Sequence, residues 1–390
     1  MQSPPAELLY ADELAFLEAY DTGDRPPGFR LTPNAFVTFV MGSNGEALKL
    51  PKGAKPRALP DGKDVPKTMT IGAKFVGARA LVERAVVTLA GERGLLLVGE
   101  PGTAKSLLSE LLSAAVSGTS ALTVQGTAGT TEDQLRYGWN YALLLAKGPS
   151  PEALVPSPVL TAMRGGAIAR IEEVTRCLPE IQDALVSILS DRRLSVPELS
   201  GDKPHVEFAN QGFNVIATAN LRDRGVSEMS AALKRRFNFE IVPSIGDANQ
   251  ETALVKERTT KTLARSGTPL PVDDAVLEAV VTIFRDLRLG RSAEGYAVEK
   301  PNAVMSTAEA VGVASAIALQ TAYLPSDRDP LSLVPGYLRG VVEKDEPKDR
   351  ARLLAYWDGP VKRRADGGPE VKNARLWKTL HDLRTRLEGE

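Results

Sequence analysis

Short apolar runs alternate with longer stretches of helical periodicity through the middle of the chain. Five runs have the length and composition of buried strands: residues 94–99, 121–126, 166–174, 213–220 and 237–242. Apolar residues recur at the spacing of one helix face at residues 81–93, 106–118, 178–194 and 227–237. Strands and helices that alternate in this way predict an α/β fold with a parallel, doubly wound sheet.

The strand signals stop after Pro243. Residues 272–290 and 306–324 have strong helical patterns, so we expect a small all-helical domain over residues 245–345. A tail over residues 346–390 ends in a basic helix with an apolar stripe: Val371, Ala374, Trp377, Leu380, Leu383 and Leu387. Such stripes more often pack on their own chain than on a partner, although both alternatives stay open here.

The N-terminal part has a different pattern. Residues 6–20 predict a short amphipathic helix, whereas residues 42–67 are rich in Gly, Pro and Lys and are typical of a linker or mobile arm. We therefore expect four parts: residues 1–67 with this helix and flexible arm, the α/β core over 68–244, the helical domain over 245–345, and the helical tail over 346–390.

Composition narrows the class of protein. A chain of 390 residues is expected to hold two or three domains, and 43% hydrophobic with 25% charged residues is normal for a soluble protein. Lys and Arg number 48 and Asp and Glu 49, which disfavours a general polyanion binder but permits a local basic groove.

Cysteine and histidine are scarce. With Cys177 as the single cysteine and two histidines, His205 and His381, an intrachain disulfide is excluded and a Cys/His metal site is not expected. The first residues lack the basic region of a signal peptide, and no apolar run approaches the roughly 18 residues that span a bilayer. We expect a cytoplasmic protein without membrane insertion.

The sequence "GEPGTAKS" lies between a buried strand and a helix, where a phosphate-binding loop belongs. Its backbone N–H groups and the start of the next helix would surround the phosphates of ATP. Lys105 would reach the β/γ-phosphates, and the Ser106 hydroxyl would bind Mg²⁺. Ala104 stands where a glycine is usual. The residues expected to bind ATP are Gly99, Glu100, Pro101, Gly102, Thr103, Ala104, Lys105, Ser106 and Leu107.

The strand expected at residues 166–174 carries three charged residues. Side chains alternate along a strand, so Arg170 and Glu172 share one face and Glu173 takes the other. The carboxyl end of a parallel strand opens into the ligand crevice. We assign Glu172 to the Mg²⁺ site and Glu173 to polarising the attacking water. Alternatively, the acids only form salt bridges; Arg170 pairs with Glu172 or with another acid.

Two further positions complete the candidate catalytic set. Asn220 stands at the carboxyl end of the next strand, where an amide can orient the attacking water, although Asn also caps turns. Arg235 and Arg236 follow Lys234 at the end of a helix, where cations favour the helix dipole. A second interpretation is an arginine finger that reaches a neighbouring subunit's nucleotide, with Arg236 the first choice and Arg235 the second.

The order of these motifs resembles the AAA+ ATPase superfamily, and most of all the MoxR family. The resemblance rests on "GTAKSLL", on "EEVTRCLPEIQDALVSILSDRRLSV", and on "ATAN" followed by "ALKRRFNFEI". It implies a P-loop AAA+ core with a helical lid, and hexameric rings with Mg²⁺-ATP between subunits. It also implies chaperone or remodelling activity on a protein partner, often one with a von Willebrand factor A (VWA) domain.

Two details depart from the family pattern. The acid pair is Glu-Glu where the family usually has Asp-Glu, so the side chain of Glu172 is one methylene longer. The lid helix that usually begins with an arginine begins here with Ser306 and has Glu309 three residues later, which predicts a capping box. Arg288 or Arg291 is the candidate substitute for the missing arginine.

Two segments have the character of insertions in the core, residues 126–158 and 194–212, and the second has the pattern of a hairpin. In the resembled family these positions line the pore or face of the ring. That would make Tyr137, Trp139 and Tyr141 candidate substrate contacts, although aromatic side chains more often cover a core.

Three functions stay open on the sequence alone. A ring-forming ATPase that remodels a protein partner is favoured because the full hydrolysis set occurs in the expected order. A nucleic-acid-linked or defence-type NTPase is disfavoured by the near-zero charge and by the lack of a recognisable nucleic-acid-binding module. An ATP-binding scaffold with little hydrolysis is kept open by Arg170, Glu172 and the missing lid arginine.

Overall fold

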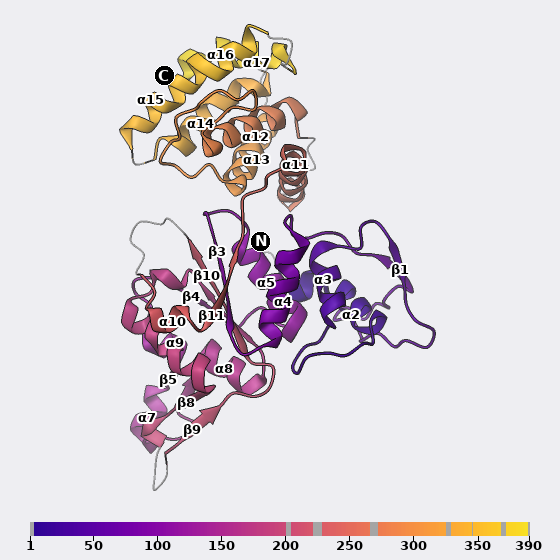
Figure 1. Ribbon diagram of the computed structural model, residues 1–390, viewed down its shortest axis with the longest axis vertical. Helices are drawn as coiled ribbons and strands as arrows, with labels where there is room; N and C mark the ends of the chain where they lie inside the picture. The colour runs from indigo at the N-terminus through magenta and orange to yellow at the C-terminus, as the bar shows by residue number, and fades with distance from the viewer. Residues whose placement is uncertain are drawn as a thin grey trace. The chain divides into compact units, whose positions relative to one another are not determined.

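The computed structural model describes residues 4–199, 204–220, 228–265, 272–324, 329–344, 346–367 and 372–388. The chain forms two compact units, a core unit and a helical unit, and apart from loop residues 101–103 the division falls between Pro243 and Ser244. The element order of each unit can be followed in Figure 1. Each unit has its own hydrophobic core.

The core unit is built on a five-stranded parallel sheet with the strand order β11-β3-β10-β7-β4. Its strands are β3 (Gly94–Gly99), β4 (Thr123–Gln125), β7 (Ile168–Glu172), β10 (Asn214–Asn220) and β11 (Phe237–Ile241). All five strands expected from the sequence are confirmed. Strand β7 ends at Glu172, two residues before the predicted end, because Glu173 turns into a left-handed conformation.

Helices cover both faces of the sheet. Leu95 and Leu97 of β3 pack in one cluster with α4 (Arg79–Ala90) and α5 (Lys105–Ser117). Leu96 and Val98 point to the opposite face and pack with α8 (Pro158–Gly165) and α9 (Pro179–Asp191). The predicted doubly wound α/β arrangement is therefore confirmed. The short helix α10 (Ala231–Lys234) lies between β10 and β11 along the chain.

The N-terminal residues belong to the same hydrophobic core. Helices α1 (Ala6–Leu9), α2 (Ala11–Tyr20) and α3 (Pro33–Met41) bury Phe16, Phe36 and Phe39 in the cluster that holds α4 and α5. The sequence pattern predicted one helix over 6–20 and a linker over 42–67. It missed α3, which starts at a Thr32 cap with Pro33 as its first residue, and the antiparallel pair of β1 (Ala47–Lys49) and β2 (Thr68–Thr70).

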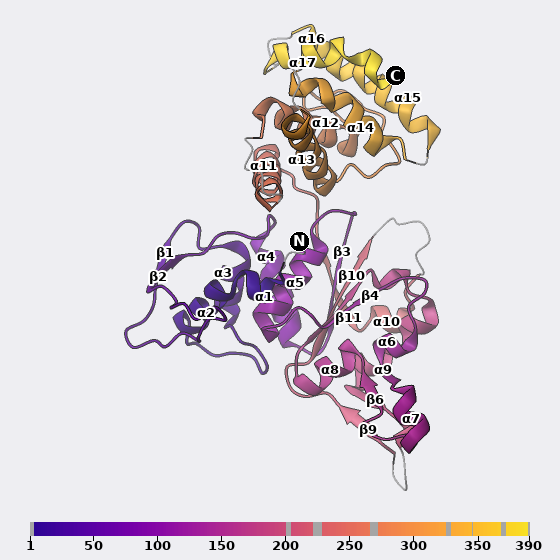
Figure 2. The same ribbon diagram turned by 180° about the vertical axis from the view of Figure 1, so that it is seen from behind.

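Two antiparallel strand pairs lie together at one end of the core unit, as both views show (Figures 1 and 2). One pair joins β5 (Tyr137–Trp139) to β6 (Leu154–Pro156), with α6 (Glu132–Leu135) before it and α7 (Tyr141–Lys147) inside the connection. The other joins β8 (Arg193–Ser195) to β9 (Val206–Phe208), which confirms the predicted hairpin. Tyr137 is buried in the core, whereas Tyr141 is 69% exposed.

The helical unit continues from Ser244 to the end of the described chain. Its α-helices are α11 (Ala248–Arg265), α12 (Asp274–Leu289), α13 (Thr307–Tyr323), α14 (Val334–Val342), α15 (Pro347–Tyr356), α16 (Lys362–Ala365) and α17 (Ala374–Asp382). This unit also has short 3₁₀ turns at Pro330–Leu333 and Arg384–Leu387 and a π-helical turn at Trp357–Val361, whereas the 3₁₀ turns at Val174–Arg176 and Pro197–Leu199 belong to the core unit.

One core unites the helical unit. Phe284 of α12 packs in the same cluster as Trp357 and Trp377, so residues on both sides of position 345, where the sequence analysis separated a tail, share one interior. The C-terminal stripe contributes Trp377, Leu380 and Leu387 to this interior, whereas Val371 lies outside the described residues. The predicted capping box is confirmed, because Ser306 and Glu309 bond each other's backbone N–H groups at the start of α13.

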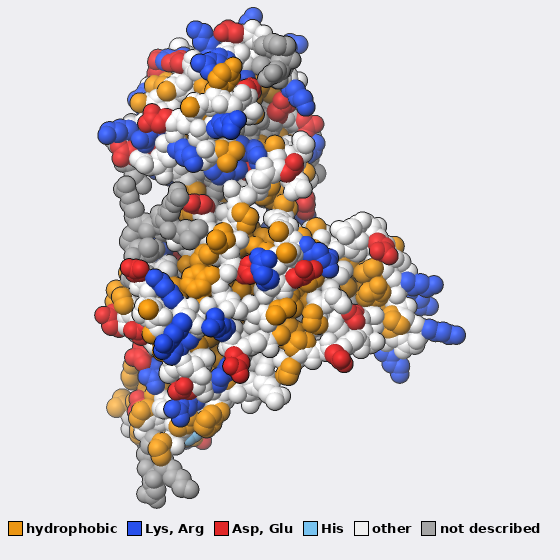
Figure 3. Space-filling model, in the orientation of Figure 1, with side chains coloured by type: hydrophobic (Ala, Val, Ile, Leu, Met, Phe, Trp, Pro, Cys, Tyr) orange, Lys and Arg blue, Asp and Glu red, His pale blue; other side chains and the backbone are white. Residues whose placement is uncertain are grey.

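Charges of both signs are mixed on the surface. Lys and Arg side chains and Asp and Glu side chains intersperse over the face of the helical unit that Figure 3 shows. Within the ranges that the structure describes, no helix is both long and apolar enough to span a bilayer.

Candidate functional site

The loop between β3 and α5 has the backbone geometry of an anion site. Gly102 and Ala104 are left-handed, with φ of 77° and 64°, and α5 begins directly afterwards at Lys105. Left-handed residues separated by one right-handed or extended residue turn successive N–H groups to one side, which forms a nest for an anion. The 13-residue helix α5 adds the positive end of its dipole to the loop.

Ala104 adopts the left-handed backbone conformation that a glycine usually provides at this position. A residue with a Cβ at this position adopts a conformation that costs about 1–2 kcal/mol relative to right-handed backbone. The loop thus retains the glycine-like turn with alanine in place, and the strain is carried locally.

Lys105 is buried within the loop. Its Nζ donates to the carbonyl oxygens of Gly99 at 3.1 Å and Glu100 at 2.8 Å, so the ammonium lies among the loop's backbone atoms. Ser106 follows it as an exposed residue, and Leu107 packs partly against the core. The nine residues expected to bind ATP therefore form one continuous turn from the end of β3 into α5.

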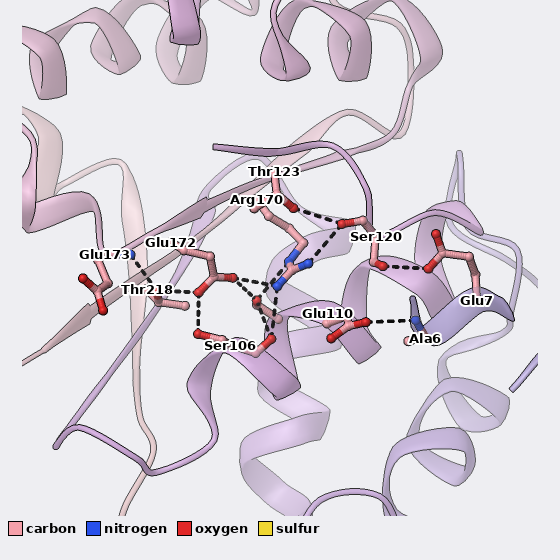
Figure 4. Close-up of polar contacts among 11 residues, drawn as sticks. Ala6, Glu7, Ser106, Glu110, Ser120, Thr123, Arg170, Glu172, Glu173 and Thr218 are labelled. Atoms are coloured by element: carbon pink, nitrogen blue, oxygen red, sulfur yellow. Dashed lines mark hydrogen bonds and ion pairs between the residues drawn. The ribbon is translucent and has the colours of Figure 1, made fainter. Parts of the chain in front are cut away.

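Glu172 is the centre of a buried hydrogen-bond network at the end of β7 (Figure 4). Its Oε2 accepts from the hydroxyls of Ser106 at 2.7 Å and Thr218 at 2.8 Å. Its Oε1 accepts from the Ser109 hydroxyl at 2.5 Å and from Arg170 Nη2 at 2.8 Å. Of the two partners that the sequence left open for Arg170, the structure has Glu172, on the same face of the strand as predicted.

The network keeps this carboxylate ionised. Burial alone raises the pKa of Glu172, but the Ser109 hydrogen bond, the Arg170 charge and the remaining hydroxyl bonds outweigh burial and hold the pKa below its usual value. Glu172 is only 5% exposed, so it is a charged acceptor in a site with little water.

Glu173 lies in a different environment although it is the next residue. Its backbone is left-handed, and its N–H donates to the Thr218 hydroxyl at 2.9 Å. Its carboxylate is 38% exposed and pairs with Arg176 Nε at 2.5 Å. The two acids of the predicted pair are therefore separated into one buried and one accessible carboxylate.

Asn220 ends β10 directly beside the phosphate loop. It is the register partner of Gly99, the last residue of β3, so the predicted residue stands at the carboxyl edge of the sheet next to Glu172's strand. Ser109 and Thr218 were not predicted. Their hydroxyls sit on α5 and β10, and only the packing of β7 against both elements identifies them as partners of Glu172.

The two arginines at the end of α10 differ in whether their side chains are bonded within their own chain. Arg236, the first choice for a finger, donates from Nε to the Ser190 hydroxyl and from Nη1 to the Ala232 carbonyl. Arg235 is exposed, and no side-chain partner of it occurs among the described residues. Lys234 pairs with Glu228 at 3.1 Å.

The candidate lid arginine Arg288 is engaged inside the helical unit. It donates to Glu251 at 2.7 Å and to the Met305 carbonyl at 3.0 Å. Arg285 and Thr307 bond the same Glu251 carboxylate, which is almost fully buried. Arg291 instead lies after α12 in an isolated bridge with Ala297.

The donor set of the core unit fits a magnesium nucleotide. The Ser106 hydroxyl and the Glu172 carboxylate offer hard oxygen atoms at one place, and Mg²⁺ prefers such ligands together with phosphate oxygens. The nest around Gly102 and Ala104, with Lys105 inside it, fits the phosphates themselves.

Comparisons with known proteins agree with this geometry. Residues 94–237 match the AAA domain of the dynein-related subfamily, and residues 249–388 match the YehL-like AAA+ ATPase C-terminal domain. The protein YehL of Escherichia coli (strain K12) is 46% identical over 388 residues, which cover 99% of this chain and 98% of YehL. The chain belongs to the family of YehL-like AAA+ ATPases. Its core unit therefore has the α/β P-loop AAA+ fold, and a helical C-terminal domain follows.

More distant relatives of this YehL-like ATPase share less of it. YojN of Bacillus subtilis (strain 168) is 25% identical over 284 residues, 70% of this chain and 80% of YojN. Among solved structures, NtrX from Brucella abortus in complex with ATP is 14% identical, covers 82% of this chain and 70% of that chain, and has a TM-score of 0.45. The YehL comparison, which spans both units, is the one that carries the family assignment.

Proposed function

We propose that this YehL-like ATPase binds and hydrolyses Mg²⁺-ATP and uses the cycle to remodel a protein partner. The observation that carries the proposal is the 2.7 Å contact between the Ser106 hydroxyl, at the start of α5, and the Glu172 carboxylate, at the end of β7. The phosphate loop that follows β3 and an acid at the end of β7 meet there, with the accessible Glu173 beside them.

Each residue of the site has a separate task in this proposal. The backbone of residues 99–104 and Lys105 bind the phosphates, and Ser106 with Glu172 would hold Mg²⁺. The bound metal supplies charge neutralisation on the phosphate oxygens. Glu173 accepts a proton from the attacking water, and Asn220 orients that water from the edge of the sheet.

Ring assembly is the second part of the proposal. The resemblance to MoxR proteins supports a homo-oligomer, with six subunits as the expected number and a VWA-domain protein as the expected type of partner. Of the two candidate fingers, Arg235 is better placed to reach another subunit, because it is exposed while Arg236 is bonded within its own chain.

A mixing experiment tests both parts of this proposal. Glu173→Gln subunits keep the finger and lack the base, whereas Arg235→Ala subunits keep the base and lack the finger. Mixed rings should recover ATP hydrolysis that neither variant has alone, and particle mass in ATP should exceed the 41.8 kDa of one subunit. Arg236→Ala, which removes the other candidate finger, is the matched comparison for Arg235→Ala. A monomeric mass with ATP, or mixed assemblies without recovered turnover, would count against the ring with a finger in trans.

One observation favours a second candidate, a nucleotide-gated scaffold with little hydrolysis. The Glu173 carboxylate is paired with Arg176 at 2.5 Å, and a carboxylate held by a guanidinium is not free to face an attacking water. In this alternative the Glu173–Arg176 ion pair persists with ATP bound. ATP turnover begins only when a partner protein separates the two side chains.

A further inference from the structure

Arg170 is a buried cation inside the catalytic strand, and all three of its guanidinium nitrogens are bonded. Nε donates to the Ser109 hydroxyl at 3.1 Å and Nη1 to the Ser120 carbonyl at 3.0 Å. Nη2 donates to the Ser106 carbonyl at 3.2 Å and to Glu172 Oε1 at 2.8 Å. The side chain therefore ties β7 to the first turns of α5, the helix that begins at the phosphate loop.

The partners of Glu172 are divided between its two oxygens. Oε1 accepts from Arg170 and Ser109, whereas Oε2 accepts from Ser106 and Thr218. With Oε1 held from one side, the carboxylate cannot rotate without losing a charged partner. Oε2 is consequently the oxygen that stays beside the Ser106 hydroxyl (Figure 4).

A glutamate at this position needs such a clamp more than an aspartate does. Its extra methylene adds a rotatable bond, so an unclamped carboxylate samples more positions than the shorter side chain. A guanidinium suits this task because its rigid fork bonds several acceptors at fixed directions, which the single ammonium of lysine cannot do.

We propose that Arg170 is a positioning residue for the magnesium site. By holding Glu172 Oε1, together with Ser109, it fixes Oε2 next to Ser106, where the metal would bind. Arg170 thereby adapts the Glu-Glu strand end to the same task as the shorter Asp-Glu pair. This inference rests on the proposed Mg²⁺-ATP binding.

The test measures nucleotide binding rather than turnover. A fluorescent ADP analogue is titrated onto the full-length protein in EDTA and at increasing Mg²⁺ concentrations, for wild type, Arg170→Met and Ser109→Ala. The result expected is an unchanged affinity in EDTA and a loss of about 10-fold or more in apparent Mg²⁺ affinity for Arg170→Met, since residues that support metal ligands have effects of this size. Ser109→Ala, which leaves the arginine in place, should give a smaller loss of the same kind.

Two controls separate positioning from simple stabilisation. Arg164→Met removes a solvent-accessible arginine that pairs with Glu207 in the same unit, and should leave the Mg²⁺ dependence unaltered. In a Glu172→Asp background the carboxylate is one methylene shorter and we expect its bond to Ser109 to be lost, so adding Ser109→Ala should change the Mg²⁺ dependence no further.

The outcomes distinguish this inference from the function on which it rests. If wild type gains no affinity from Mg²⁺, the proposed function fails and this inference with it. If wild type gains affinity and folded Arg170→Met gains as much, the inference alone is overturned. Should Arg170→Met not fold, Ser109→Ala decides: an unaltered Mg²⁺ dependence in that variant also overturns the inference.

Discussion

The Thr218 hydroxyl donates to the Glu172 carboxylate at 2.8 Å and at the same time accepts the N–H of Glu173 at 2.9 Å. One side chain of β10 thus fixes both the buried acid and the turn that exposes the next acid. The relative position of these two carboxylates depends on a neutral residue of the neighbouring strand.

Replacing this hydroxyl should damage catalysis more than nucleotide binding. Thr218→Val keeps the shape of the side chain but leaves the Glu173 N–H without its acceptor and Glu172 without one donor. We expect kcat for ATP hydrolysis to fall about 10-fold, with nucleotide affinity retained, since a hydrogen bond to a charged group contributes roughly 1.5–3 kcal/mol. Thr218→Ser retains the hydroxyl and should stay close to wild type. Equal rates for both variants would contradict this role.

The left-handed alanine of the phosphate loop predicts a stabilising substitution. Ala104→Gly should raise the free energy of unfolding by about 0.5–1 kcal/mol, because relief of the left-handed strain exceeds the added freedom of the unfolded chain. Chemical denaturation followed by far-UV circular dichroism measures the change. Ala90→Gly, at the exposed end of α4, is the matched control and should destabilise by up to about 1 kcal/mol. If both substitutions change the free energy of unfolding in the same direction, position 104 carries no strain.

The ion pair between Glu173 and Arg176 should hold basal ATP turnover below its full rate. Arg176→Gln removes the guanidinium that holds the carboxylate and leaves Glu173 free to face the attacking water, so basal ATP turnover should rise several-fold while ATP affinity changes little. Arg193→Gln removes a comparably exposed arginine that pairs with Asp191 and serves as the control. A fall in turnover for Arg176→Gln would mean that Arg176 assists catalysis rather than restraining it.

The buried carboxylate of Glu251 predicts a pH-dependent stability of the helical unit. Burial raises its pKa, but hydrogen bonds from Arg288, Thr307 and Arg285 and the charge of Arg288 outweigh burial, so the folded pKa lies below the ordinary value. The unfolded chain therefore takes up the proton first. The stabilising contribution is complete above the unfolded pKa of about 4.3 and is lost as pH falls through the folded pKa.

Glu251→Gln should accordingly destabilise the helical unit by about 3 kcal/mol at pH 7, because it leaves two partly buried arginines without their charge partner. The difference from wild type should begin to shrink as pH falls below the unfolded pKa of about 4.3, where the unfolded chain takes up a proton, and should be lost once pH lies below the folded pKa. Tryptophan fluorescence in a Trp139→Phe background reports this unit, since Trp357 and Trp377 are the other two tryptophans. A difference that is independent of pH would contradict the assignment.

The sequence predicts the sheet better than the surroundings of the site. Strands such as β3 are continuous apolar runs because helices cover both of their faces, and that pattern is visible along the chain. The strand order is set by which faces pack together and was not predicted. Helix α11 was missed because few of its 18 residues are apolar and buried, with Val255 and Leu263 as examples.

The residues of the candidate site likewise fall into some that the sequence predicted and some that it did not. Lys105, Ser106, Glu172, Glu173 and Asn220 were predicted because their positions at strand and helix ends are marked in the sequence. Ser109 and Thr218 were not, since a hydroxyl among apolar residues carries no signal until the packing of three elements brings it to Glu172. The separate environments of Glu172 and Glu173 arise from one left-handed residue, which sequence does not specify for glutamate.

The decisive measurement is steady-state ATP hydrolysis with Mg²⁺ on wild type, Glu173→Gln and Glu180→Gln, with ATP binding measured on the same samples. It shows whether the protein hydrolyses ATP and whether Glu173 is the base. Glu180 is an exposed acid in the first turn of α9 and is the matched control. We expect all three proteins to bind ATP, wild type and Glu180→Gln to hydrolyse it equally, and Glu173→Gln to lose about 100-fold or more in turnover. Equal turnover in wild type and Glu173→Gln, or ATP binding without hydrolysis in all three, would contradict this expectation.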